Sequence, residues 1–171
     1  MAKNPVGIAI ERLIGYLATH PEECRRVDQP ATAILQEDLR CRVTALDGQS
    51  IDTDMAVGLG GGGTAPSPGW FFRASIAACN ATTIAMRAAR LGITLNRLEI
   101  TVHSESDRRG LLGMDEFVAP GPLRMNVGVK LGAEGIDPAK LREIVCWAHG
   151  HSPMTDAIAR AVETKVDVHV A

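Results

Sequence analysis

The stretch SPGWFFRASIAACNATTIAMRAARLG, residues 67–92, decides the fold because it predicts one long buried helix. The serine and proline at its start suit an N-cap and a first helical turn, and its closing glycine is a natural C-terminal cap. Residues 74–86 are small or apolar all round, as in a helix that is packed on most sides. We therefore expect a central helix with Cys79 near its middle.

The flanking segments predict shorter elements in a simple order. Residues 4–19 suggest an amphipathic helix, and residues 31–55 suggest two or three strands, including a hairpin formed by 39–46 and 50–54. We interpret the glycine run at 58–63 as a flexible crossover that gives ligands access. Further expected elements are strands at 95–104 and 123–131 with a long loop or hairpin tip at 108–122, helices at 137–149 and 152–162, and a closing strand at 165–170. Because the strands are grouped, this order predicts an α+β fold rather than a doubly wound parallel sheet.

Composition argues against several kinds of partner. The net charge is −2 and the basic residues are scattered, so no positive surface for nucleic acid is predicted. No apolar run approaches the roughly 18 residues of a membrane span, and residues 1–16 do not resemble a secretory signal. We therefore expect a cytoplasmic protein that does not bind membranes.

The cysteines are widely spaced, which predicts free thiols rather than a disulfide framework: Cys24, Cys41, Cys79 and Cys146. Cys79 is the first candidate for chemistry, because Ser75, Thr82 and Thr83 share its helical face and would surround the sulfur with hydroxyls. The alternative is an inert thiol that fills a gap beside alanines. A reactive thiolate in mid-helix needs a cation from elsewhere in the fold.

Two segments carry a resemblance to the OsmC/Ohr family. Ser67-Pro68 followed by AACNATTIAMRAARLGI around Cys79 resembles the family's central helix, and HSPMTDAI at 151–158 is similar to the start of its second helix. The resemblance covers residues 31–170 and implies antiparallel sheets packed around a long central helix, in an intertwined homodimer with reactive sites at the subunit interface. It further implies that Cys79 reduces organic hydroperoxides or related oxidants. We expect one OsmC-like domain over residues 1–171, with the helix in 1–20 as an addition to the shortest family pattern.

Two positions depart from the peroxidases of that family. Their second helix begins with Cys-Pro, whose cysteine resolves the oxidised first one, whereas Ser152 stands here and offers only a good N-cap. The organic hydroperoxide branch places a glutamate, which orients an activating arginine, directly after the helix-opening proline, whereas Gly69 stands here. Arg40 and Arg42 lie near the expected place of that arginine, on one face of a strand. Alternatively, they are ordinary solvated charges.

Recycling and metal binding involve the helix predicted at 137–149 and the residues just after it. An oxidised Cys79 would be restored by an external thiol or by Cys146, although Cys146 is also suited to packing on the apolar face of its helix. Cys146, His149 and His151 have zinc-binding side chains, but three ligands so close together across a helix end rarely converge. We expect no metal and no cofactor.

Two functions remain open from the sequence. In the first, Cys79 attacks a peroxide oxygen, an arginine of the N-terminal strands stabilises the thiolate and the transition state, and an outside thiol reductant completes the cycle. In the second, a non-catalytic family member binds a small hydrophobic ligand in an apolar dimer cleft with Trp70, Phe71 and Phe72 at its mouth. For that trio, the pattern favours packing in the core at the start of the long helix over lining the mouth of a pocket. The retained Cys79 favours the first function, and the two departures favour the second.

Overall fold

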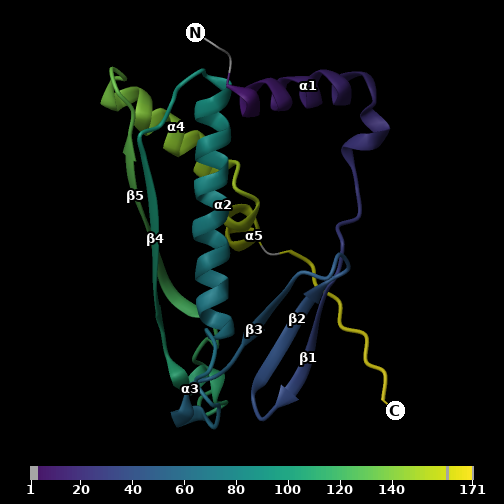
Figure 1. Cartoon of the computed structure of the whole chain (residues 1–171). Helices are drawn as coiled ribbons and strands as arrows, with labels where there is room; N and C mark the ends of the chain where they lie inside the picture. Colours follow the sequence, from purple (N-terminus) through teal and green to yellow (C-terminus); the bar gives the residue numbers. More distant parts are fainter. Residues whose placement is uncertain (1–3, 161, 171) are drawn as a thin grey trace.

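The computed structural model describes residues 4–160 and 162–170, and its elements follow the predicted order as far as α5 (Figure 1). The helices are α1 (Pro5–Thr19), α2 (Pro68–Arg90), α3 (Arg108–Leu111), α4 (Pro138–Gly150) and α5 (Pro153–Ala159), with short 3₁₀ turns at Pro21–Cys24 and Val57–Leu59. The strands are β1 (Ala31–Glu37), β2 (Arg40–Ala45), β3 (Ser50–Thr53), β4 (Arg97–Ser106) and β5 (Pro122–Gly132). Within the described residues, no helix combines the length and the apolar content that a membrane span requires.

The strands form two separate antiparallel sheets, which confirms the α+β prediction. One sheet has the order β1-β2-β3 and the other consists of β4 and β5. In the first sheet Arg42 of β2 faces Asp52 of β3. Figure 1 shows the two sheets on opposite sides of α2, with β4 and β5 close to the helix and the N-terminal sheet standing apart from it.

Helix α2 organises the core. It begins at the predicted cap, where Ser67 Oγ accepts a hydrogen bond from the Trp70 N–H at 3.3 Å, and it packs against β4, α4, α1 and α5. Its buried positions recur every four residues along one face: Ile76, Asn80, Ile84 and Ala88. Ile84 meets Ile144 and Ala148 of α4 in the hydrophobic core.

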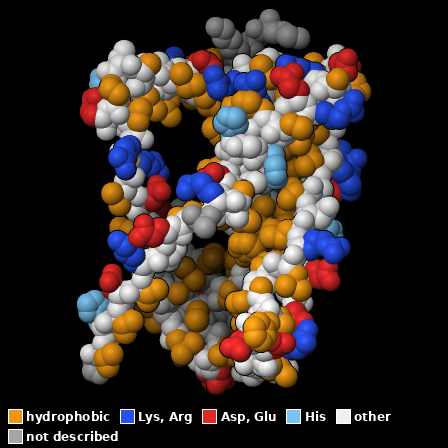
Figure 2. All heavy atoms as spheres, turned by 180° about the vertical axis from the view of Figure 1, so that it is seen from behind, with side chains coloured by type: hydrophobic (Ala, Val, Ile, Leu, Met, Phe, Trp, Pro, Cys, Tyr) orange, Lys and Arg blue, Asp and Glu red, His pale blue; other side chains and the backbone are white. Residues whose placement is uncertain are grey.

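The opposite face of α2 is uncovered in this chain. It exposes small and apolar side chains: Ala78, Thr82, Ala85 and Met86. Figure 2 shows hydrophobic side chains gathered along the middle of the molecule, and an opening separates them from the N-terminal sheet. The prediction of a helix packed on most sides is therefore wrong for the chain alone, because the N-terminal sheet does not fold back over this face.

Helix α1 confirms the amphipathic helix predicted at 4–19 and docks on the end of α2. A Cβ at the buried Gly7 would lie 2.5 Å from the Ala89 carbonyl oxygen, so the close approach of the two helices requires glycine. Arg90 Nε and Glu11 Oε1 form an ion pair at 2.7 Å across the same contact.

The predicted closing strand at 165–170 is wrong for the chain alone. Residues 162–170 pair with no strand among the described residues, and they run out to a free end in Figure 1. A strand needs a neighbour to satisfy its backbone N–H and C=O groups, and none of the described strands pairs with this segment. The valines on one face of the segment are exposed, at 82% for Val166, 76% for Val168 and 92% for Val170. Two smaller differences are that α5 ends at Ala159 rather than near 162, and that the loop at 108–122 contains α3.

Candidate active site at the contact of α2 and α5

Cys79 is half-buried, and its sulfur meets the first residue of another helix. Ser152 Oγ donates a hydrogen bond to Cys79 Sγ at 3.2 Å. Ser152 is 0% exposed and stands at the N-cap position of α5, yet its side chain makes no cap hydrogen bond. The predicted side-chain cap is therefore wrong, because this hydroxyl is directed to the sulfur instead of a backbone N–H.

The hydroxyls that share the helical face of Cys79 do not surround its sulfur. Thr83 Oγ1 donates to the Cys79 carbonyl oxygen at 2.6 Å, and Ser75 Oγ donates to the Phe72 carbonyl oxygen at 2.8 Å. Hydroxyls in a helix commonly bond the carbonyl one turn back, which local spacing alone does not reveal. Among the described residues, Ser152 is thus the side chain that donates to Cys79 Sγ, and the predicted polar strip around the sulfur is wrong.

Asn80, which is 1% exposed, ties α2 to the α4–α5 turn that carries Ser152. Its Nδ2 donates to the Ile76 carbonyl oxygen at 2.9 Å and to Thr155 Oγ1 at 3.2 Å, while its Oδ1 bonds His149 Nδ1 at 3.1 Å. Buried amides are usually fully bonded, and this one holds the turn on both sides of Ser152. Sequence reasoning missed this residue, although an amide within an apolar helical stretch was the available signal.

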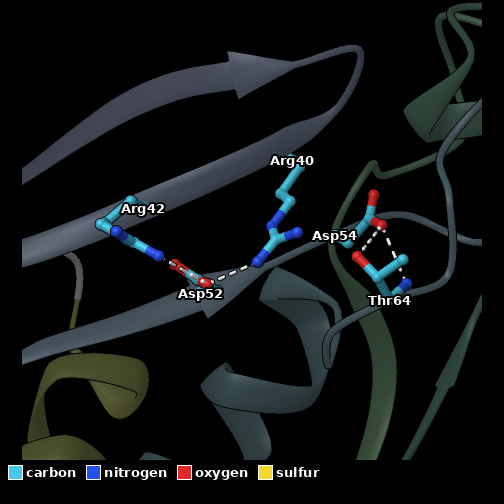
Figure 3. A network of polar contacts seen from close by, with 5 residues as sticks. All are labelled: Arg40, Arg42, Asp52, Asp54 and Thr64. Atoms are coloured by element: carbon cyan, nitrogen blue, oxygen red, sulfur yellow. Dashed lines mark hydrogen bonds and ion pairs between the residues drawn. The ribbon is translucent and has the colours of Figure 1, made fainter.

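Arg40 and Arg42 lie on one face of β2, as strand alternation predicts, and both bind Asp52 (Figure 3). Arg40 Nη2 donates to Asp52 Oδ2 at 2.7 Å, and Arg42 donates through Nε to Oδ1 at 2.8 Å and through Nη2 to Oδ2 at 3.1 Å. These bonds hold the pKa of the Asp52 carboxyl well below its ordinary value, and the bond from Arg42 has the largest effect. Neither arginine donates to Cys79 within the described chain, because β2 stands apart from α2.

Gly69 occupies the first turn of α2 with open space around it. A Cβ there would meet nothing closer than Ser67 Oγ at 3.9 Å and Arg73 Nη1 at 4.0 Å. Packing therefore does not require glycine at this position. The carboxylate that holds Arg40 and Arg42 is instead Asp52, on β3.

The glycine run is folded around a buried carboxylate that sequence reasoning missed. Asp54 is 2% exposed and accepts hydrogen bonds from the N–H groups of Met55, Gly62 and Thr64 and from the Thr64 hydroxyl, at 2.7 to 3.3 Å (Figure 3). A Cβ at Gly61 would collide with the Met55 carbonyl. The structure thus shows a loop closed on a carboxylate where the sequence suggested an open crossover.

Asp54→Asn is expected to lower the thermal unfolding midpoint by several degrees near neutral pH, because the new amide NH₂ faces backbone and hydroxyl donors. The hydrogen bonds to Asp54 lower the pKa of its carboxyl in the folded state, and the bond from the Thr64 N–H has the largest effect. The stability that they add is present above the unfolded pKa of about 3.9 and is lost as the pH falls through the folded value. Thermal unfolding of the wild type and the variant over a pH series should show the difference between their unfolding midpoints shrinking in acid. A difference that stays constant with pH would contradict this account.

Three residues with zinc-binding side chains lie at the end of α4 and do not converge: Cys146, His149 and His151. His151 stacks on Trp147 at 3.9 Å between ring centroids and bonds the Trp147 carbonyl oxygen through Nδ1 at 2.7 Å, while His149 is held by Asn80. Within the described residues, no group of three His, Cys, Asp or Glu side chains is placed to hold a metal ion. Cys146 is exposed, so the prediction that it packs on the apolar face of its helix is wrong for the chain alone.

The aromatic trio at the start of α2 divides into two environments. Trp70 is 47% exposed and meets Phe71 edge-on, with ring centroids 5.1 Å apart. Phe71 and Phe72 are half-buried. The phenylalanines thus contribute to packing at the start of the helix, whereas Trp70 stays largely on the surface.

Comparison with known proteins places this architecture in a family. The family model for OsmC-like proteins matches residues 60–167. No curated protein sequence matches the chain. Among solved structures, the chain is similar to an organic hydroperoxide resistance protein OsmC of Legionella pneumophila, with 24% identity and a TM-score of 0.57 over 78% of this chain and 90% of that one. It is also similar to the organic hydroperoxide resistance protein OhrB of Bacillus subtilis, with 23% identity and a TM-score of 0.53 over 80% of this chain and 94% of that one. A third similar structure is an OsmC-like protein of Mycoplasma pneumoniae, with 17% identity and a TM-score of 0.67 over 80% of this chain and 91% of that one. The fold is therefore the OsmC-like fold, and the chain belongs to the OsmC/Ohr family.

Proposed function

We propose that this protein reduces organic hydroperoxides, with Cys79 as the attacking thiol and an external thiol as the reductant. The observation that carries the proposal is the hydrogen bond from the buried Ser152 hydroxyl to the half-buried Cys79 sulfur. An O–H donor favours the thiolate over the thiol, and a partly exposed residue suits a thiol that must meet a substrate. Family membership supports the same chemistry, since two similar structures are organic hydroperoxide resistance proteins.

The proposed reaction has two stages. The Cys79 thiolate attacks the terminal oxygen of R–O–O–H, so an S–O bond forms, the O–O bond breaks, and the alkoxide leaves as R–OH after taking a proton. The sulfur is oxidised to a sulfenic acid and the peroxide is reduced. An external thiol then displaces water to give a mixed disulfide, and a second thiol group releases Cys79 while forming a new disulfide outside the protein.

The activating cation in this proposal comes from a second copy of the chain. Because Arg40 and Arg42 do not reach Cys79 within one chain, we place Arg40 or Arg42 of the partner subunit beside the sulfur in a homodimer. Asp52 binds both guanidinium groups and so supplies the orienting carboxylate that is missing at Gly69. A positive group near the sulfur favours the thiolate and stabilises charge as the O–O bond breaks.

The apolar surfaces of the chain support a homodimer. The uncovered face of α2, the valines of 162–170 and two side chains of β1, Ile34 at 57% and Leu35 at 62% exposure, would all be covered by a second copy. Large apolar side chains that stay exposed on several elements of one chain suit an interface with a second copy. The alternation of valine with polar residues along 165–170 further suits a strand that pairs with the other copy.

Val168→Lys is therefore expected to raise the dimer dissociation constant by at least about tenfold, because burying an unpaired ammonium is costly. His169→Lys is the matched control, since its side chain lies on the other face of the same extended segment. Sedimentation over a concentration series measures both variants and the wild type. A wild type that stays monomeric at every concentration would exclude the dimer.

Hydroperoxide consumption by the wild-type protein tests the function itself. With cumene hydroperoxide as substrate, we expect turnover that requires added dithiothreitol or dihydrolipoamide and that exceeds turnover of hydrogen peroxide. The dithiols should outperform a monothiol because the mixed disulfide is then resolved within one molecule. No thiol-dependent consumption would contradict the proposal and favour the non-catalytic, ligand-binding alternative.

A further inference from the structure

A cavity lies between β5 and the two C-terminal helices, lined in part by residues that Asn80 bonds. Its volume is about 350 Å³, within the range of small-molecule sites. The lining includes an apolar part, formed by Ile76, Val127 and Ile158, and a polar part, formed by Asn126, His149 and Thr155. Among the described residues that line it, His149 is the one ionisable side chain, and Cys79 is not part of the lining.

The bonds of Asn80 determine which ring nitrogen His149 offers to this cavity. Both amide hydrogens of Asn80 are used, one by the Ile76 carbonyl oxygen and one by Thr155 Oγ1. Its Oδ1 is an acceptor only, so the 3.1 Å contact with His149 Nδ1 requires a proton on Nδ1. The ring is thus held in a fixed orientation, with Nε2 as the nitrogen that remains for a ligand.

Thr155 supplies a second group at the same place. Its Oγ1 accepts from Asn80, so its own hydroxyl hydrogen remains to be donated, and no acceptor for it lies within the described residues. Asn80, at 1% exposure, therefore positions two of the three polar lining residues, His149 and Thr155. The pair offers two directed hydrogen bonds beside an apolar wall, which is the usual composition of a small-molecule site.

We propose that this cavity binds a short aliphatic carboxylate, with His149 and Thr155 as its head-group ligands. As the carboxylate binds, Nε2 takes up a proton from solvent and donates it in a hydrogen bond to one carboxylate oxygen, and the Thr155 hydroxyl donates to the other. The aliphatic chain lies against Ile76, Val127 and Ile158. No carboxylate among the described lining residues repels the anion. This site is separate from the proposed peroxide chemistry and does not depend on it.

Calorimetric titration of the full-length protein with hexanoate tests this site. We expect saturable binding of hexanoate that is stronger than binding of hexan-1-ol, its uncharged analogue. His149→Gln should weaken hexanoate at least about tenfold through loss of a charge-assisted hydrogen bond, and Thr155→Val should weaken it by a smaller factor. His20→Gln, on the distant α1 side, is the matched control and should bind as the wild type does.

Methyl NMR of the wild-type protein gives a second measurement that needs no variant to fold. Hexanoate is expected to shift the methyl signals of Ile76, Val127 and Ile158. Binding that survives in Cys79→Ser separates this site from the peroxide site. The inference is overturned by absence of hexanoate binding, by equal affinity in His149→Gln, or by methyl shifts confined to other parts of the protein.

Discussion

Cys79→Ser is expected to lose thiol-dependent reduction of cumene hydroperoxide by at least about a thousandfold, the scale seen when a catalytic nucleophile is removed. A serine hydroxyl is a weak nucleophile without an adjacent base, and the one donor found at this sulfur, Ser152, is not a base. Because Cys79 is half-buried and close in size to serine, the variant should fold with a similar unfolding midpoint.

The other cysteines are the matched controls for this experiment, measured as initial rates of peroxide loss. Cys24→Ser, Cys41→Ser and Cys146→Ser should each keep turnover, because the proposed cycle uses one protein thiol and an external reductant. Undiminished turnover in Cys79→Ser would remove this cysteine from the chemistry. Loss of turnover in Cys146→Ser alone would instead identify Cys146 as a resolving thiol and contradict the one-cysteine cycle.

Ser152→Cys is expected to convert the site into a disulfide-forming pair. Ser152 Oγ lies 3.2 Å from Cys79 Sγ, so a cysteine sulfur at that position needs only a modest side-chain adjustment to reach the S–S bond length of about 2.05 Å. One equivalent of cumene hydroperoxide should then form a sulfenic acid on Cys79, which the new thiol attacks with release of water. The expected readouts are the loss of two titratable thiols and a linked pair of peptides in mass spectrometry.

Ser152→Ala is the matched control for this switch. It offers no second thiol, so no disulfide forms, and it removes the hydroxyl that donates to the sulfur. Its reaction with peroxide should therefore be slower than that of the wild type. Two results would contradict the close contact of the two positions. In one, Cys79 and the new cysteine of Ser152→Cys both remain free thiols after peroxide treatment. In the other, the variant accumulates sulfinic acid as readily as the wild type does.

The central helix and the order of the elements were predictable because their signals are local. The Ser67 cap, the proline after it and the apolar run of α2 act within a few turns of chain, and the structure confirms the cap bond and the helix that follows. The hairpin of β2 and β3 likewise follows from strand alternation and its turn. Alternation also predicted that Arg40 and Arg42 share a face.

The contacts that build the site were not predictable, because they join residues far apart in the chain. Ser152 and Cys79 are 73 positions apart, and Asn80 and Thr155 are 75 apart. Sequence spacing suggested hydroxyls one turn away, which bond the helix backbone instead. Two predictions failed for the same reason, which is that the element in question has no neighbour among the described residues of one chain. They are the closing strand within 162–170 and the burial of α2 on most sides.

The most direct measurement of the central claim is mass spectrometry of Cys79 after one equivalent of cumene hydroperoxide, with a sulfenic acid trap present. The account predicts that the Cys79 peptide carries the trapped sulfenic acid before any other cysteine peptide does. An unmodified Cys79 thiol, with the peroxide left intact or consumed at the exposed Cys24 or Cys146, would contradict it.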